Sequence, residues 1–110
     1  LAEKLHSAWA GDGVRVIQVS AYYGANGGAE WLKAQGETDK TIGTHAAIRD
    51  TSELMAVFPG GIRTDKLAAD KDGVTGDARR ASAERGDMLI GLKVDAAVRE
   101  ITAAREIVPR

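Results

Sequence analysis

The sequence predicts an α/β fold in which helices flank a mainly parallel sheet. A helical pattern at the start of the chain is followed by the run VRVIQVSAYY at 14–23, whose β-branched residues suit a largely buried strand. A helix that leads into a buried strand is typical of parallel sheets, because parallel strands are joined by crossover connections. With 44% apolar residues the chain can form one compact domain, so we treat residues 1–110 as a single unit of structure.

The elements of the predicted sheet are too few for a complete fold. The segment LAEKLHSAW places Leu1, Leu5 and Trp9 at helical spacing, which indicates that the chain begins inside a helix. Only 14–23 has a clear strand pattern, and 60–75 adds one short strand at most. The sequence therefore predicts a partial domain, with the remaining strands supplied by a preceding segment or by a partner.

A glycine-rich turn, GANGG at 24–28, follows the predicted strand and precedes a short helix expected over 29–35. It lacks the lysine of a P-loop and the spacing of a dinucleotide fingerprint, which favours a plain strand-to-helix turn. Tyr22, Tyr23 and Trp31 bracket the turn. Aromatic side chains at the carboxyl end of a strand are candidate walls of a substrate pocket, and packing in a core or an interface is the alternative.

The segment GTHAAIRDTSELM at 43–55 holds one of only two histidines in the chain. His45 lies five residues before Asp50, at an expected helix entrance. Asp50 and the two residues after it are good N-caps. Glu53, three positions after Asp50, gives the spacing of a capping box. This pattern predicts a helix that ends before Pro59. His45 and Asp50 are therefore either a chemical pair or the parts of a helix junction.

A long amphipathic pattern occupies the C-terminal third of the chain. The polar, glycine-rich stretch 60–77 is expected to be an ordered excursion, and Asp77 to cap a helix over 78–106. Two apolar stripes lie on different sides of that helix: Ile90, Val94, Ala97, Val98 and Ile101 on one, and Met88, Leu89, Leu92 and Ala96 on the other. Two apolar sides require two partners, so this helix predicts contact between the subunits of a homo-oligomer.

Composition excludes several classes of function. The formal net charge is -1, with 15 basic and 16 acidic residues interspersed, which disfavours binding to nucleic acid or to an anionic membrane surface. The apolar runs are too short to span a bilayer, and the N-terminus lacks the regions of a signal peptide. We expect a soluble protein, cytoplasmic or periplasmic. The absence of cysteine excludes disulfides and thiol nucleophiles.

Two segments carry a resemblance to a known family. GTHAAIRDTSELMAVFP at 43–59 resembles the pattern of the creatininase, or creatinine amidohydrolase, family, in which His-Ala-Gly precedes Glu-Thr-Ser and a helix ending at proline. DGVTGDARRASAERG at 72–86 is similar to the family's Gly-Val-x-Gly-Asp-Pro segment, which opens a helix through Ala-Ser-x-Glu. The chain departs from the pattern at Ala47, Asp50 and Ala78, where the family has glycine, glutamate and proline.

The resemblance implies the C-terminal portion of a creatininase-like layered fold. It implies a metal-dependent amidohydrolase that hydrolyses a C–N bond, in an amide or a cyclic amide, with a divalent metal such as Zn or Mn in the complete enzyme. The family's Glu-x-His, Thr-Asp and Asn-Gly-His metal motifs do not occur in this chain. Two histidines are too few for such a centre. An N-terminal segment of the same enzyme, on a companion chain or a missing fragment, would carry the metal.

The resemblance also assigns roles to individual residues. His45 matches the family histidine that faces a small-molecule substrate and carries a proton. Asp50 is expected to orient His45, to approach the metal or to cap the helix. Tyr22, Tyr23 and Trp31 are the candidate substrate-binding residues. The alternative hypothesis is a self-contained, non-catalytic domain that uses the helix 78–106 for assembly.

Overall fold

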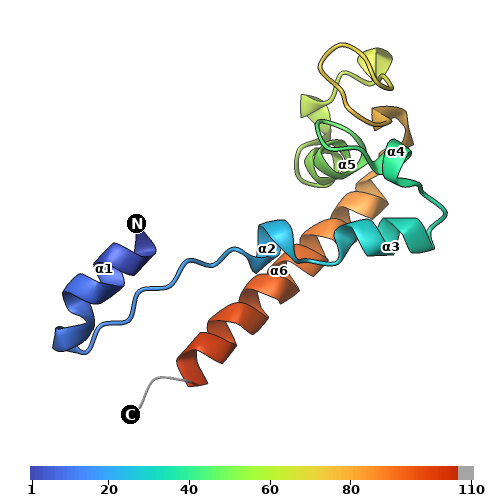
Figure 1. Cartoon of the computed structure of the whole chain (residues 1–110). Helices are drawn as coiled ribbons and strands as arrows, with labels where there is room; N and C mark the ends of the chain where they lie inside the picture. Colours follow the sequence, from blue (N-terminus) through green and yellow to red (C-terminus); the bar gives the residue numbers. More distant parts are fainter. Residues whose placement is uncertain (107–110) are drawn as a thin grey trace. The chain divides into compact units, whose positions relative to one another are not determined.

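The computed structural model describes residues 1–106, and in that range it contains helices and 3₁₀ turns but no β-strand (Figure 1). The six α-helices of this range are α1 (Ala2–Trp9), α2 (Ala21–Gly24), α3 (Gly28–Ala34), α4 (Asp39–Ile42), α5 (Ile48–Val57) and α6 (Ala83–Glu106). The 3₁₀ turns are Ala10–Asp12, Pro59–Gly61, Thr64–Lys66 and Ala78–Arg80. The predicted α/β fold with a mainly parallel sheet is therefore wrong for this chain.

The run 14–23 does not form the predicted strand because no second strand pairs with it. Its last residues belong to α2, and the rest is an extended stretch between α1 and α2 (Figure 1). Within residues 1–106, the N–H groups of Ile17, Gln18 and Val19 make no hydrogen bond. A β-branched pattern favours extended backbone, but a strand also needs neighbouring backbone groups to bond.

The short strand expected within 60–75 is also wrong. That stretch contains two 3₁₀ turns, and isolated antiparallel bridges join His45 to Thr75 and Ala69 to Asp77. Asp70 and Asp72 have positive φ angles of 50° and 54°, and backbone in that region cannot continue a strand. The polar, glycine-rich stretch is an ordered excursion, as the sequence predicts.

The chain divides into two compact units. One consists of Leu1–Asn26 together with the residues from Lys93 onward, and the other of Gly27–Leu92. The second unit has a hydrophobic core in which α3, α4, α5 and α6 contribute one residue each: Leu32, Ile42, Ile48 and Leu89. Trp31 packs against this core. The candidate site lies in this unit, and Thr51 of α5 belongs to its pocket lining.

Helix α6 begins five residues later than the sequence predicts. Asp77 caps the preceding 3₁₀ turn instead, with its Oδ1 accepting from the N–H of Arg79 at 3.1 Å. Ser82 takes the capping role at α6, because its Oγ accepts from the N–H of Arg85 at 3.2 Å. The fully buried Ser52 of α5 accepts in turn from the N–H of Ser82 at 3.1 Å. Helix α5 therefore supports the entrance of α6.

The unit that contains α1 buries very little. Helices α1 and α2 have no buried residue, and Ala96 is the one residue of α6 beyond Lys93 that is buried among those described. Glu100 holds the start of α2, since its Oε2 accepts from the N–H groups of Ser20 and Ala21 at 3.0 and 2.8 Å. Among residues 1–106, no helix has the length and apolar character needed to cross a bilayer.

Gly86 tests the close packing of α5 on α6. A Cβ on Gly86 would collide with the carbonyl oxygen of Ser52 and lie 2.8 Å from the Cβ of Ala56. We expect Gly86→Ala to lower the free energy of unfolding by about 1–3 kcal/mol, the usual cost of overpacking. Gly91 belongs to the same helix and has open space within 4 Å of the point where a Cβ would lie, which makes it the matched control.

Gly91→Ala should instead raise the free energy of unfolding by about 0.5–1 kcal/mol, because alanine restricts the unfolded chain more than glycine does. Urea unfolding of both variants measures the two shifts. Shifts of the same sign would contradict the packing described here.

Candidate functional site

The two segments that resemble the creatininase family meet in the second unit. The N–H of Thr44 and the N–H of His45 donate to the carbonyl oxygen of Thr75 at 2.9 and 3.3 Å, and the N–H of Thr75 donates to the carbonyl oxygen of His45 at 2.9 Å. His45 belongs to the first segment and Thr75 to the second. This pairing joins residues that are thirty positions apart in the sequence.

Two glycines allow the segments to approach this closely. Gly43 and Gly76 have φ angles of 63° and 120°, which side chains rarely tolerate. A Cβ on Gly76 would lie 2.7 Å from the Cβ of Ala47 and 2.8 Å from the Cα of Gly43. The N–H of Asp77 donates to the carbonyl oxygen of Thr41 at 2.9 Å and continues the contact. The backbone around His45 is therefore fixed by contacts on both segments.

Asp50 organises the backbone beside His45 rather than capping the helix at its first position. Helix α5 begins at Ile48, three residues earlier than an Asp50 cap would place it. The Oδ2 of Asp50 accepts from the N–H of Ala46 at 2.8 Å, and Thr51 Oγ1 donates to the carbonyl oxygen of Ala46 at 3.1 Å. These bonds stabilise Ala46 at a φ angle of 51°, an unfavourable value for alanine.

His45 lies in the loop before α5 and Asp50 in the first turn of α5, and both are exposed. No hydrogen bond joins the imidazole to the carboxylate among the described residues, so they are not a bonded dyad. The second carboxylate oxygen of Asp50 makes no hydrogen bond to a described residue. This helix junction thus presents one imidazole and one carboxylate oxygen to solvent, where a substrate or a partner can reach them.

The aromatic candidates do not share one environment. Tyr22 and Tyr23 lie on α2 with 45% and 80% of their surface exposed, and they belong to the first unit. Trp31 belongs to the second unit and packs against its hydrophobic core. For Trp31 the core-packing alternative describes its position, whereas the role of the two tyrosines in substrate binding stays a prediction.

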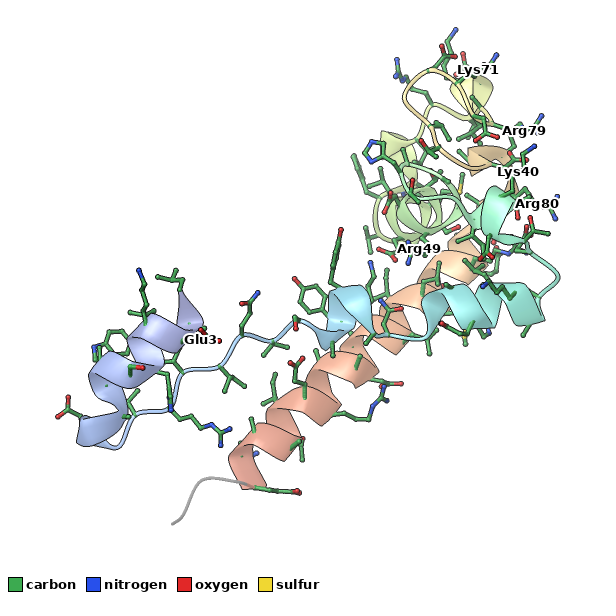
Figure 2. All side chains as sticks on the ribbon, in the orientation of Figure 1. Glu3, Lys40, Arg49, Lys71, Arg79 and Arg80 are labelled. Carbon is green, nitrogen blue, oxygen red and sulfur yellow. The ribbon has the colours of Figure 1, made fainter. Side chains whose placement is uncertain are left out.

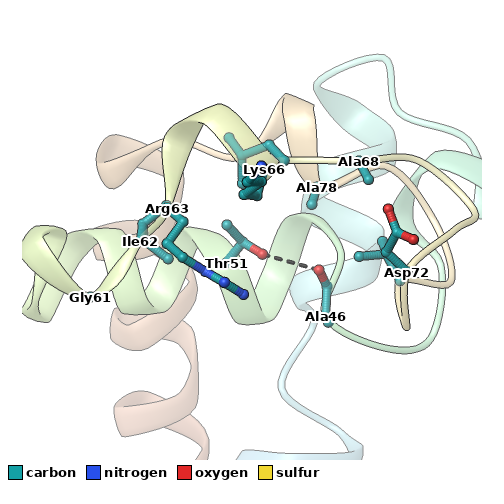
Figure 3. Close-up of a pocket in the computed structure, with 11 residues that line it drawn as sticks. Ala46, Thr51, Gly61, Ile62, Arg63, Lys66, Ala68, Asp72 and Ala78 are labelled. Carbon is teal, nitrogen blue, oxygen red and sulfur yellow. Dashed lines mark hydrogen bonds between the residues drawn. The ribbon is translucent and has the colours of Figure 1, made fainter.

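A pocket of about 230 Å³ lies where the two segments meet (Figure 3). The first segment contributes Ala46 and Thr51, and the second contributes three residues of which Asp72 is charged. The excursion between them contributes Arg63 and Lys66 (Figure 3). Sequence reasoning missed these three charged residues, because they occur singly in a polar stretch and only the folding of that stretch brings them together.

The described residues do not form a metal centre by themselves. Within residues 1–106, no group of three or more His, Asp or Glu side chains is placed to hold a metal ion. His6 lies on α1, where its Nδ1 accepts from the N–H of Val16 at 3.2 Å. Asp50 could therefore contribute at most one ligand to a centre whose other ligands come from elsewhere.

A buried carboxylate holds the second segment in place. The side chain of Glu37 is 1% exposed. Its Oε2 accepts from Arg80 Nε at 2.7 Å and from Thr41 Oγ1 at 2.8 Å, and its Oε1 lies 2.8 Å from Arg85 Nη1. Figure 2 shows Arg79 and Arg80, which belong to the 3₁₀ turn Ala78–Arg80 of the second segment. Glu37 thus connects the residues after α3 to the entrance of α6.

These donors lower the pKa of Glu37 to about 2. The hydrogen bond from Arg80 is the largest cause, and Thr41 and Arg85 act in the same direction. Burial opposes them, because it penalises the charged carboxylate. The carboxylate therefore stays ionised at every pH at which the protein is expected to be folded.

Comparison of the chain with protein-family models, with curated proteins and with solved structures gave no match. The relation to the creatininase family therefore stays a prediction from the two segments at 43–59 and 72–86.

Glu37 should make folding depend on pH in the acid range. Its pKa is about 2 in the folded chain against an ordinary 4.5, so the unfolded chain binds more protons between these values. The stability that ionised Glu37 contributes is complete at pH values above its unfolded pKa of 4.5. It is lost as the pH falls toward the folded pKa of about 2. The shift corresponds to about 3 kcal/mol.

We therefore expect Glu37→Gln to be less stable than the unmodified protein by about 3 kcal/mol near neutral pH, with the difference shrinking as the pH approaches about 2. Denaturant unfolding at a series of pH values measures this. Asp39→Asn is the control, because Asp39 pairs with Lys33 at 2.8 Å on the exposed surface and should contribute little. A difference that does not change with pH would contradict the role given to Glu37.

Proposed function

We propose that this chain is the substrate-facing portion of a metal-dependent amidohydrolase that hydrolyses an amide or cyclic-amide C–N bond. The observation that carries the proposal is the backbone pairing of His45 with Thr75. It joins the two segments that resemble the creatininase family. His45 is exposed, and the next residue, Ala46, lines a pocket to which both segments contribute.

His45 is the proposed proton carrier. Its own N–H and carbonyl oxygen are bonded to Thr75, and the N–H of the next residue is bonded to Asp50. The backbone is therefore fixed while the imidazole is free to accept a proton from water and donate one to a leaving nitrogen. In this proposal Asp50 is a positioning residue, because it acts on His45 through the backbone of Ala46.

The metal would come with a companion polypeptide. Hydrolysis in this family uses a divalent ion, Zn or Mn, to polarise the carbonyl and to activate water. The described residues do not assemble a ligand set for such an ion. We therefore propose that the N-terminal segment of the same enzyme supplies the metal ligands and that this chain supplies His45 and the pocket.

Complementation tests the catalytic proposal. The chain is mixed with the N-terminal portion of a creatininase-family enzyme, which carries the three metal motifs, in the presence of Zn²⁺ or Mn²⁺. Release of amine from a panel of small amides and cyclic amides is then measured. We expect His45→Ala to lower kcat by about 10²–10⁴-fold, the usual contribution of a general acid–base group, without loss of the complex.

His6→Ala is the control, since His6 is the other histidine of the chain and lies outside the proposed site. It should leave kcat unchanged. Equal turnover by His45→Ala and the unmodified chain would remove His45 from the mechanism. A metal-loaded complex that hydrolyses none of the amides would count against the function itself.

A second candidate function, non-catalytic assembly, is favoured by the exposed face of α6. Val94, Val98 and Ile101 are 54%, 55% and 43% exposed, and their spacing of four and three residues places them on one side of the helix. An apolar stripe of this kind is costly to leave in water. Under this hypothesis the stripe is the contact between the subunits of a homo-oligomer.

Val98→Asp should separate such an oligomer into single chains, because it would bury an unpaired charge at the contact. Ala103→Asp is the control, because it adds the same charge at an exposed position outside the stripe. Light scattering coupled to size-exclusion chromatography reports the mass, against 11.6 kDa for one chain. A single-chain mass for the unmodified protein would contradict assembly through this face.

A further inference from the structure

We propose that the pocket between the two segments binds the carboxylate of a small molecule. The inference deepens the proposed function, because it names a substrate class for the same site. Its catalytic meaning rests on that function, but the binding itself requires neither a metal nor a companion.

The short side chains in the wall of the pocket leave room for a small molecule. Most of the lining consists of aliphatic side chains or glycine: Ala46, Gly61, Ile62, Leu67, Ala68, Val74 and Ala78. Thr51 also lines it, but its hydroxyl hydrogen is used in the bond to the Ala46 carbonyl oxygen (Figure 3). A volume of about 230 Å³ is below the roughly 300–1,000 Å³ of pockets for drug-sized ligands. The pocket therefore fits a molecule of a few heavy atoms.

Two cations at the pocket have spare binding capacity. The guanidinium of Arg63 makes no hydrogen bond or ion pair with any residue in 1–106. Lys66 has one weak pair, with its Nζ 3.9 Å from Asp65 Oδ2 and both groups exposed. A planar guanidinium matches the two oxygens of a carboxylate, and the ammonium adds a second positive charge.

Asp72 limits the charge of the ligand. It is the one acidic residue in the lining, so the two cations leave a net positive charge of one. In the view of Figure 3, Arg63 and Lys66 approach from the left and the top and Asp72 from the right. A monoanion whose carboxylate lies toward the cations neutralises this net charge, whereas a phosphate dianion would leave the site with a net negative charge.

Amide hydrolysis makes this ligand class relevant to the proposed function. Water adds its oxygen to the carbonyl carbon, the C–N bond breaks, and the nitrogen leaves with a proton, so the products are a carboxylate and an amine. A pocket for carboxylates lined by Ala46, the residue after His45, would therefore hold either a carboxylate already present in the substrate or the one that the reaction forms.

The test is an NMR titration of the ¹⁵N-labelled chain with butyrate, with its neutral isostere butyramide and with inorganic phosphate. We expect butyrate to shift the amide signals of residues 62–68, and butyramide to bind at least about tenfold more weakly, because it lacks charge-assisted hydrogen bonds. Phosphate should also bind more weakly than butyrate. Equal affinity for butyrate and butyramide, tighter binding of phosphate, or no shift with butyrate would each overturn the proposal.

Variants assign the binding to the pocket. Arg63→Gln should weaken the binding of butyrate by about tenfold. Arg63→Lys should retain part of the affinity, because the positive charge remains. Lys71→Gln removes the same charge from the same excursion outside the lining, so it should have little effect. Asp72→Asn should tighten binding of butyrate, since it removes a repulsive charge.

Equal losses for Arg63→Gln and Lys71→Gln would show a general charge effect and overturn the site. The amide spectrum of each variant, recorded without ligand, reports whether the variant is folded. If Arg63→Gln does not fold, Arg63→Lys keeps the test decisive. Because the titration uses the chain alone, absence of butyrate binding refutes the pocket, while absence of turnover in the complemented enzyme refutes the proposed function.

Discussion

The second unit depends on one buried carboxylate, that of Glu37. A buried charge is stable only when its partners satisfy it, and Glu37 receives donors from Thr41, Arg80 and Arg85. Thr41 belongs to α4, whereas Arg80 in the 3₁₀ turn Ala78–Arg80 and Arg85 in the first turn of α6 both belong to the second segment. The residues near α4 and the second segment are therefore held at one point, and removing the carboxylate would leave two arginines without their common partner.

The candidate site follows from the placement of the second segment. With its end held at Glu37 and α6 packed on α5 at Gly86, the residues before it lie against the loop of His45. Gly43 and Gly76 allow the two backbones to touch, and the excursion between the segments completes the pocket. The exposed imidazole and the pocket are therefore products of the same packing, although the imidazole is not part of the pocket lining.

The two units differ in how well their apolar residues are covered. The second unit has a core built from four elements, whereas the first buries Ala96 and leaves Val94, Val98 and Ile101 exposed. A unit with so little buried surface gains little from the hydrophobic effect. The proposed chemistry is assigned to the second unit and the proposed contact between subunits to the first, so the two functions can be tested with separate variants.

Local sequence determined the short helix near 29–35, the helix that ends before Pro59, the helical C-terminal third and the junction at His45 and Asp50, because these depend on residues close together in the chain. It did not determine a sheet: the β-branched run 14–23 favours extended backbone, but a strand forms only when another strand pairs with it. Tertiary structure alone decided that Arg63, Lys66 and Asp72 line one pocket and that Arg80 and Arg85 share Glu37. These groups are brought together by long-range packing, which cannot be predicted from their spacing in the sequence.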